Sequence, residues 1–124
     1  MKKYLFAFTA IVLAVVFSSF TKPFANKTFR LKAGVDKTSP TQVALKSNWE
    51  EATLSCTGSA DIPCTITVDE SFTSIVNGDR VLNTSGSFIT IQTENGLLDT
   101  APEPDVQYIR VASGTNYTFA NKVK

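Results

Sequence analysis

The sequence of 124 residues contains no histidine. Histidine is the commonest general base in enzymes, and the usual serine and cysteine nucleophiles depend on it. The chain also has only two cysteines, Cys56 and Cys64. A zinc site takes about four ligands, which are mostly histidine and cysteine side chains. These absences exclude serine–histidine and cysteine–histidine hydrolases, and they leave no recognisable ligand set for a metal.

Acidic residues could still support catalysis or bind calcium. They occur as the groups Glu50 with Glu51, Asp69 with Glu70, and Asp99 with Glu103 and Asp105. Adjacent residues of a strand point to opposite faces, so neighbouring acids do not converge on one bond as glycosidase chemistry requires. The group at 99–105 lacks the spacing and the glycine of an EF-hand loop. We therefore interpret these acids as solvated surface and predict no enzyme activity, no catalytic residue, no metal and no cofactor.

Neither sign of charge dominates the chain, which has 12 basic and 11 acidic residues and a formal net charge of +1. Lys2, Lys3 and Lys22 lie within the first 25 residues, and no acid does, so the remainder has a formal net charge of −2. A slightly acidic domain has no electrostatic attraction for nucleic acid or for anionic membrane surfaces. We therefore expect no nucleic-acid partner, and the charge identifies no other partner.

The N-terminal residues have the features of a secretory signal. Lys2 and Lys3 form a positive start, and an almost wholly apolar run follows at 4–17. Small polar residues, Ser18 and Ser19, end this run. A positive start, an apolar centre and a small polar exit are typical of a segment that directs export.

This segment divides the chain into two parts. We expect a signal peptide at 1–25 and an exported domain at 26–124, with the mature protein beginning between Ser19 and Asn26. The uncharged stretch at 4–21 has 18 residues, and a membrane-spanning helix needs about 20, so an uncleaved anchor is the alternative. The expected location is periplasmic or extracellular, and any membrane contact would pass through this retained anchor.

Beyond residue 25 the sequence alternates between strand-like segments and turn signals. Alternation of apolar and polar residues predicts strands near 62–68, 87–93 and 106–112. The turn signals between such segments are Asn77-Gly78, which is typical of a two-residue hairpin, Asn95-Gly96 and Ser113-Gly114. The segment 42–52 fits either a strand or a helix. We therefore expect an all-β fold, a small antiparallel meander or sandwich-like domain after an N-terminal signal helix.

Both cysteines lie in alternating segments. Cys56 is in phase with Leu54, Cys64 is in phase with Ile66, and the turn-rich stretch 57–61 separates them. Two antiparallel strands joined by this loop would place the cysteines opposite each other, within the range of a disulfide. A redox motif would have two residues between its cysteines, and here there are seven. In an oxidising compartment we expect a structural disulfide between Cys56 and Cys64.

Three aromatic residues, Trp49, Tyr108 and Tyr117, could form a platform for a sugar or a peptide. The alternative is that they lie in the core or at its rim. A single tryptophan flanked by polar residues such as Asn48 and Glu50 is more typical of the core or rim, and we predict no binding residue among the aromatics.

Three short motifs carry a resemblance to known proteins. These are Ser47-Asn48-Trp49, Cys56-Thr57-Gly58 and Pro63-Cys64-Thr65-Ile66. Together with the N-terminal signal, they resemble a group of short exported bacterial proteins that have an asparagine–tryptophan pair and two cysteines around a small polar loop. The resemblance implies a location in the bacterial envelope or outside the cell, and it supports the pairing of Cys56 with Cys64. It brings no activity and no site residue.

Two classes of function stay open on the sequence. The first is an exported, non-enzymatic module that serves interaction or envelope structure and is held by one disulfide. The alternative is a small hydrolase or inhibitor with an unrecognised site. A compact fold without a cleft would favour the first class, and a pocket with two convergent carboxylates would favour the second.

Overall fold

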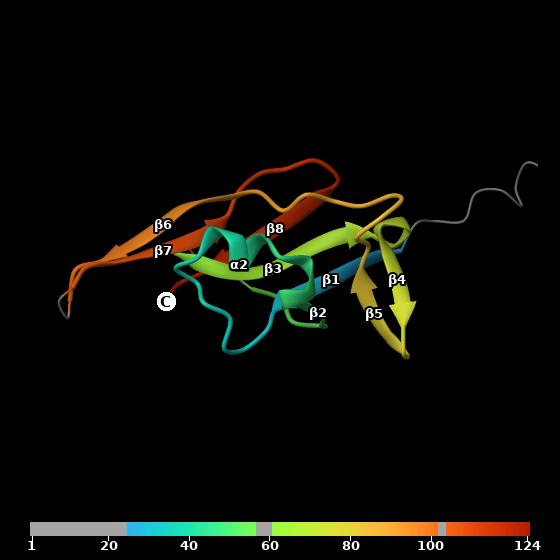
Figure 1. Cartoon of the computed structure of the whole chain (residues 1–124), viewed down its shortest axis with the longest axis horizontal. Coiled ribbons are helices and arrows are strands. Elements are labelled where there is room, and N and C mark those ends of the chain that lie inside the picture. The colour runs from blue at the N-terminus through green and yellow to red at the C-terminus, as the bar shows by residue number, and fades with distance from the viewer. Residues whose placement is uncertain (1–24, 57–60, 102–103) are drawn as a thin grey trace, which may run out of the picture.

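The computed structural model describes residues 25–56, 61–101 and 104–124 (Figure 1). The predicted signal segment at 1–25, apart from Ala25, lies outside the described residues, as does most of the loop between the cysteines. Strands hold 47% of the described residues and helices 12%. This balance confirms the expected all-β fold.

Four antiparallel strands form the main sheet. They are β1 (Asn26–Leu31), β2 (Trp49–Glu51), β3 (Ile62–Asp69) and β8 (Tyr117–Lys122), in the spatial order β2-β1-β3-β8. Phe29 of β1 lies opposite Ile66 of β3, and Ile66 lies opposite Phe119 of β8, so the three side chains share one face. The strand predicted at 62–68 is therefore confirmed as β3.

The other face of the main sheet is polar at its centre. The hydroxyls of Thr28 and Thr67, which are cross-strand partners, lie 3.0 Å apart. Arg30 Nε donates a hydrogen bond of 2.7 Å to its own cross-strand partner, Glu50. An apolar face and a polar face are the pattern of an antiparallel sheet that buries one side.

Two hairpins complete the β structure, and Figure 1 shows them at opposite ends of the molecule. Their strands are β4 (Thr73–Val76) with β5 (Asp79–Leu82), and β6 (Thr93–Asp99) with β7 (Val106–Val111). Between β4 and β5, Asn77 and Gly78 have φ angles of 52° and 88°, as the predicted two-residue turn requires. The strand predicted near 106–112 is confirmed as β7.

The turn predicted at Asn95-Gly96 is wrong. Both residues lie within β6, where the register against β7 shifts between Asn95 and Leu98. Leu97 N donates to Asp61 O at 3.3 Å, and a Cβ on Gly96 would lie 2.2 Å from that same oxygen. The glycine therefore serves a close approach of two backbone segments rather than a chain reversal.

The strand predicted near 87–93 is also wrong, because β6 begins only at Thr93 and the preceding residues join no ladder. Ile89 and Ile91 are nevertheless buried, with exposed fractions of 1% and 4%. The alternation in the sequence reflected which side chains face the core. It carried no information on whether another strand lies within hydrogen-bonding distance.

The ambiguous segment 42–52 divides between helix and strand. Its first part belongs to α2 (Pro40–Ala44), a 3-10 turn η1 (Lys46–Asn48) follows, and β2 covers Trp49–Glu51. Ser39 caps α2, since its hydroxyl accepts a hydrogen bond from Gln42 N at 3.4 Å, and proline suits the first helical position. Both interpretations were therefore right for part of the segment.

A single core joins the main sheet to the elements that cover its apolar face. It includes Phe29 and Ile66 of the sheet, Val43 of α2, Ile89 of the irregular segment and Ile109 of β7. In Figure 1, α2 lies over β3, whereas the β6–β7 hairpin starts beside the sheet and extends beyond its end. The arrangement is sandwich-like, with one complete sheet and a second, partly irregular layer.

Candidate functional site: a lysine-lined pocket beside β2

The Cys56–Cys64 disulfide is present, with the two Cα atoms 6.3 Å apart. The prediction that two paired antiparallel strands carry the two cysteines is wrong. β2 ends at Glu51, residues 52–56 are not in a strand, and β1 lies between β2 and β3. The disulfide therefore links the irregular segment after β2 to the buried strand β3. β2 itself pairs with β1 and not with β3.

A pocket of about 380 Å³ lies between β2 with its preceding turn η1 and the β4–β5 hairpin. We call it the lysine pocket. Its lining comprises two lysines (Lys32 and Lys46), four apolar residues (Trp49, Val76, Val81 and Leu82) and five small polar residues (Ser47, Ser74, Asn83, Thr84 and Ser85). Its volume is within the usual range for small-molecule sites. No carboxylate belongs to this lining.

Trp49 forms part of the wall of this pocket and is held firmly in place. Its exposed fraction is 2%, and its indole Nε1 donates a hydrogen bond of 2.8 Å to Val43 O. Asn48 Nδ2 donates to Gln42 O at 2.8 Å from the adjacent position. These two bonds fix η1 and the start of β2 against α2, so this wall of the pocket is rigid.

The two lysines of the pocket have no carboxylate partners among the described residues. Lys32 Nζ donates to Ser47 O at 2.8 Å, and Lys46 Nζ lies 4.1 Å from the ring centroid of Phe88. Burial lowers the pKa of the Lys46 ammonium. Two lysines without a carboxylate partner therefore line the pocket, and the ammonium of one of them, Lys46, lies over Phe88, which is not part of that lining.

A second hollow of about 410 Å³ adjoins the lysine pocket and shares Lys32, Trp49 and Val81 with it. We call it the arginine hollow, because Arg80 dominates its chemistry. Arg80 forms ion pairs of 3.4 Å with Glu51 and 2.9 Å with Glu70 and also donates to Thr73 Oγ1 at 2.8 Å. Its guanidinium is thus satisfied within the protein, unlike the two ammonium groups next to it.

The structure does not bring the predicted acidic groups together. Glu50 pairs with Arg30 across the outer face, whereas Glu51 reaches Arg80, because neighbours in β2 point to opposite faces. Asp69 accepts a hydrogen bond of 2.8 Å from Ser71 N and caps a 3-10 turn, η2 (Glu70–Phe72). Among the described residues no group of three acids or cysteines is placed to hold a metal ion.

The third acidic group lies at the far end of the β6–β7 hairpin. The Asp99 carboxylate accepts a hydrogen bond from Lys124 Nζ and another from Ala101 N at 3.3 Å. Asp105 is exposed, and Glu103 lies outside the described residues. The structure therefore shows Asp99 as the partner of a lysine, and no second carboxylate among the described residues contacts it.

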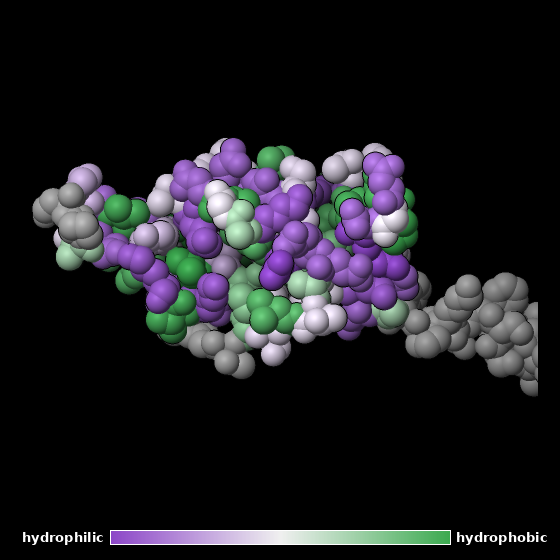
Figure 2. Space-filling model, turned by 90° about the horizontal axis from the view of Figure 1, so that it is seen from below, coloured by the Kyte–Doolittle hydropathy of each residue, from purple (hydrophilic) through white to green (hydrophobic). Residues whose placement is uncertain are grey.

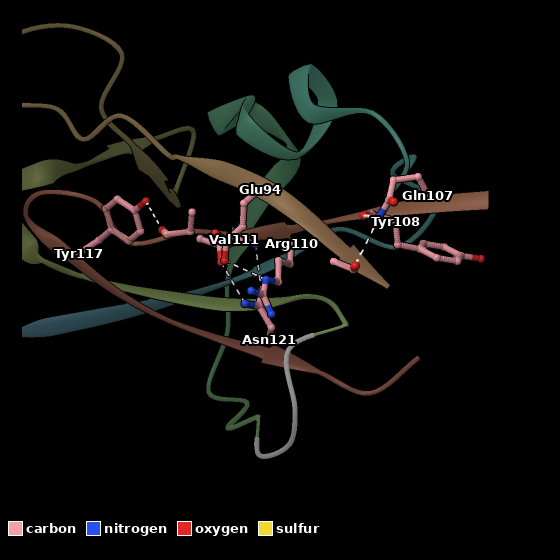
Figure 3. Close-up of polar contacts among 9 residues, drawn as sticks. Glu94, Gln107, Tyr108, Arg110, Val111, Tyr117 and Asn121 are labelled. Atoms are coloured by element: carbon pink, nitrogen blue, oxygen red, sulfur yellow. Dashed lines mark hydrogen bonds and ion pairs between the residues drawn. The ribbon is translucent and has the colours of Figure 1, made fainter. Parts of the chain in front are cut away.

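The three aromatic residues do not form a platform. Tyr117 is buried, its hydroxyl donates to Ala112 O at 2.7 Å, and the same oxygen accepts from Gln92 N at 2.9 Å. Figure 3 shows Tyr117 and Tyr108 well separated along the molecule, and Tyr108 instead lies beneath Lys124 Nζ, 4.9 Å from its ring centroid. Trp49 and Tyr117 are core residues, which confirms the alternative interpretation.

The exposed apolar residues of the described chain are spread over several elements. The large ones are Leu45, Leu54, Ile75, Val76, Phe88, Leu98, Phe119 and Val123, which come from many different elements. Figure 2 shows hydrophobic residues on one face as separate small groups among polar ones. A wide apolar docking face of the kind that marks large protein interfaces is not visible on this side.

No protein-family model, no curated protein and no solved structure matches this protein. Among the described residues no helix is both long and apolar enough to cross a membrane. The fold and the cysteines thus define a small all-β protein with one disulfide. A disulfide is typical of proteins outside the reducing cytoplasm.

Sequence reasoning missed the lysine pocket. Its two lysines are 14 positions apart, and the opposite wall comes from the β4–β5 hairpin some 30 residues further on. The only local signal was the presence of Lys46 and Ser47 directly before the buried Trp49. The cavity arises from how β2 and β5 lie beside each other, which no sequence spacing reveals.

Proposed function

We propose that this protein is an exported, non-enzymatic interaction module, and that the lysine pocket is its binding site. The observation that carries this proposal is a preformed cavity whose lining combines two lysines without carboxylate partners and an apolar wall. The predicted signal segment and the disulfide support export to a periplasmic or extracellular location. The disulfide closes a short loop and so supports the small core.

A hydrolase is the alternative, and one observation favours it. Ser47 lies beside Lys46, whose pKa is lowered by burial, and serine–lysine pairs act as nucleophile and base in some hydrolases. Such a pair needs a hydrogen bond between the hydroxyl and the amine. No such bond joins a serine of the lysine pocket to either lysine; Lys32 instead contacts the main-chain oxygen of Ser47. The binding function therefore has more support.

Export can be tested by expressing the whole chain in a bacterium that has a periplasm. We expect the protein outside the cytoplasm, with an N-terminus between Ser19 and Asn26 on N-terminal sequencing. An intact Met1 on a membrane-bound form would support the uncleaved anchor instead. An intact Met1 on a soluble cytoplasmic protein would contradict export.

The absence of catalysis can be tested on the exported protein with ester, glycoside and peptide substrates. We expect no turnover above that of buffer. The same protein, immobilised, should retain a partner from the native envelope fraction, and soluble protein should compete for it. Turnover that disappears in Ser47→Ala would replace the binding function with the hydrolase alternative.

A further inference from the structure

We propose that the lysine pocket binds a small organic carboxylate, an anion whose single charge is carried on a compact apolar body. This inference rests on the proposed function and specifies its ligand class.

The charges of the pocket favour an anion. Lys32 uses one of its three N–H donors on Ser47 O, and Lys46 has its ammonium over the ring of Phe88. A carboxylate bound in the pocket could accept a charge-assisted hydrogen bond from a remaining donor of Lys32, and the charge of Lys46 would add a longer-range attraction. Because residues 26–124 as a whole, these two lysines included, have a formal net charge of −2, this positive site is local.

The apolar wall favours a ligand with more than a charged group. Leu82 and Trp49 form a buried base, whereas Val76 at the rim is 51% exposed. A bound apolar body would remove this rim from water and would contact the indole ring. The hydroxyls of the lining, such as Ser74 and Thr84, are available to orient the carboxylate.

The arginine hollow limits how much negative charge a ligand can carry. Glu50, Glu51 and Asp79 line this hollow together with Lys32, which lines both cavities. Arg80 already pairs with two glutamates and offers no planar fork to an incoming phosphate. A polyanion that extends along both cavities would meet these acids, so a compact monoanion is the better fit.

The single tryptophan supplies the readout. Trp49 is the only tryptophan of the chain and lines the pocket, so its fluorescence reports binding there directly. The probes are cyclohexanecarboxylate, its neutral amide cyclohexanecarboxamide, acetate and inorganic phosphate. We expect a saturable change with cyclohexanecarboxylate, with a Kd on the order of 1 mM or lower, and binding at least about tenfold weaker for the other three.

Lysine variants test the two charged contacts separately. Lys32→Met and Lys46→Met keep the length of the aliphatic stem and remove the ammonium, and each should weaken cyclohexanecarboxylate binding about tenfold. Lys122→Met is the matched control, because Lys122 is exposed and lies outside this pocket, and it should bind as the wild type does. Circular dichroism and thermal melting confirm that each variant is folded.

The comparison of acid and amide needs only the wild-type protein and therefore stays decisive if a lysine variant does not fold. Equal binding of the amide, or tighter binding of phosphate, would overturn the inference. No binding of any probe by a protein that retains an envelope partner would also overturn it, while leaving the proposed function intact. Turnover of a substrate would instead contradict the proposed function.

Discussion

Asn121 holds both main-chain groups of Val111. Its Oδ1 accepts from Val111 N and its Nδ2 donates to Val111 O, both at 3.0 Å (Figure 3). Asn121 is 6% exposed, and Val111 is fully buried. The side chain thus makes the two hydrogen bonds that a neighbouring strand would make, and it joins β8 of the main sheet to β7 where the two strands form no ladder.

Replacing Asn121 should therefore destabilise the protein strongly. Asn121→Asp keeps the shape but turns an amide donor into a carboxylate oxygen that faces Val111 O in a buried site. We expect the free energy of unfolding to fall by roughly 2–4 kcal/mol, measured by urea denaturation. Lys122→Ala, an exposed change at the next position, should leave it within about 0.5 kcal/mol. Similar losses of unfolding free energy in both variants would show that the hydrogen bonds between Asn121 and Val111 contribute no specific stability.

The parts of the fold that the sequence predicted are those determined by local chemistry. β3 and β7 follow from alternation, and the β4–β5 turn follows from Asn77-Gly78, because a two-residue turn with positive φ angles has few solutions. The predicted disulfide is present, but the supporting hairpin is not. Alternation near Cys56 corresponded to neither a strand nor burial, since Leu54 is 48% exposed, and the strands next to β3 are β1 and β8.

The parts that could not be predicted depend on contacts between distant segments. Gly96 resembled a turn residue, and only the approach of Asp61 explains it. The role of Asn121 could not be predicted from the sequence, since its partner Val111 belongs to β7, in the other layer of the fold. The candidate site has the same origin, because Lys46 meets the β4–β5 hairpin only once β2 has paired with β1.

Gly96 offers a direct test of that close approach. A methyl group there would lie 2.2 Å from Asp61 O, so one of the two segments must shift. Gly96→Ala should lower the free energy of unfolding by roughly 1–3 kcal/mol in urea denaturation. Asn95→Ala, an exposed substitution in the same strand, is the control and should have little effect. Identical denaturation midpoints for wild type and Gly96→Ala would show that the contact can relax without cost.

The disulfide should stabilise the domain by restricting its unfolded chain. Replacing both Cys56 and Cys64 with alanine should lower the free energy of unfolding by roughly 2–3 kcal/mol, as expected for a loop of this length. Reduced wild-type protein provides the control without any mutation and should unfold at nearly the same urea concentration as the double variant. Mass spectrometry that finds two free thiols in the exported protein, or an unchanged melting temperature for the double variant, would contradict this role.

The ion pair between Asp99 and Lys124 predicts a specific pH dependence. The hydrogen bond from the Lys124 ammonium, and then the one from Ala101 N, hold the pKa of Asp99 below its ordinary value of 3.8. A group whose pKa is lower in the folded state stabilises the fold above its unfolded pKa, and this contribution disappears as the pH falls through the folded pKa. The loss of this stabilisation therefore occurs only in acidic solution below about pH 4.

Lys124→Met tests this relationship. In a titration of the side-chain carboxyl carbons by NMR, we expect the pKa of Asp99 to rise toward 3.8 in the variant, because the ammonium that favours the ionised form is gone. Asp36 is an internal control: the hydroxyl and the main-chain N–H of Thr38 lower its pKa, and neither changes in the variant. Any difference in thermal stability between the two proteins should shrink as the pH falls from 5 toward 2, since Asp99 becomes neutral in both. An Asp99 pKa that does not move would mean that Lys124 does not contact this carboxylate in solution.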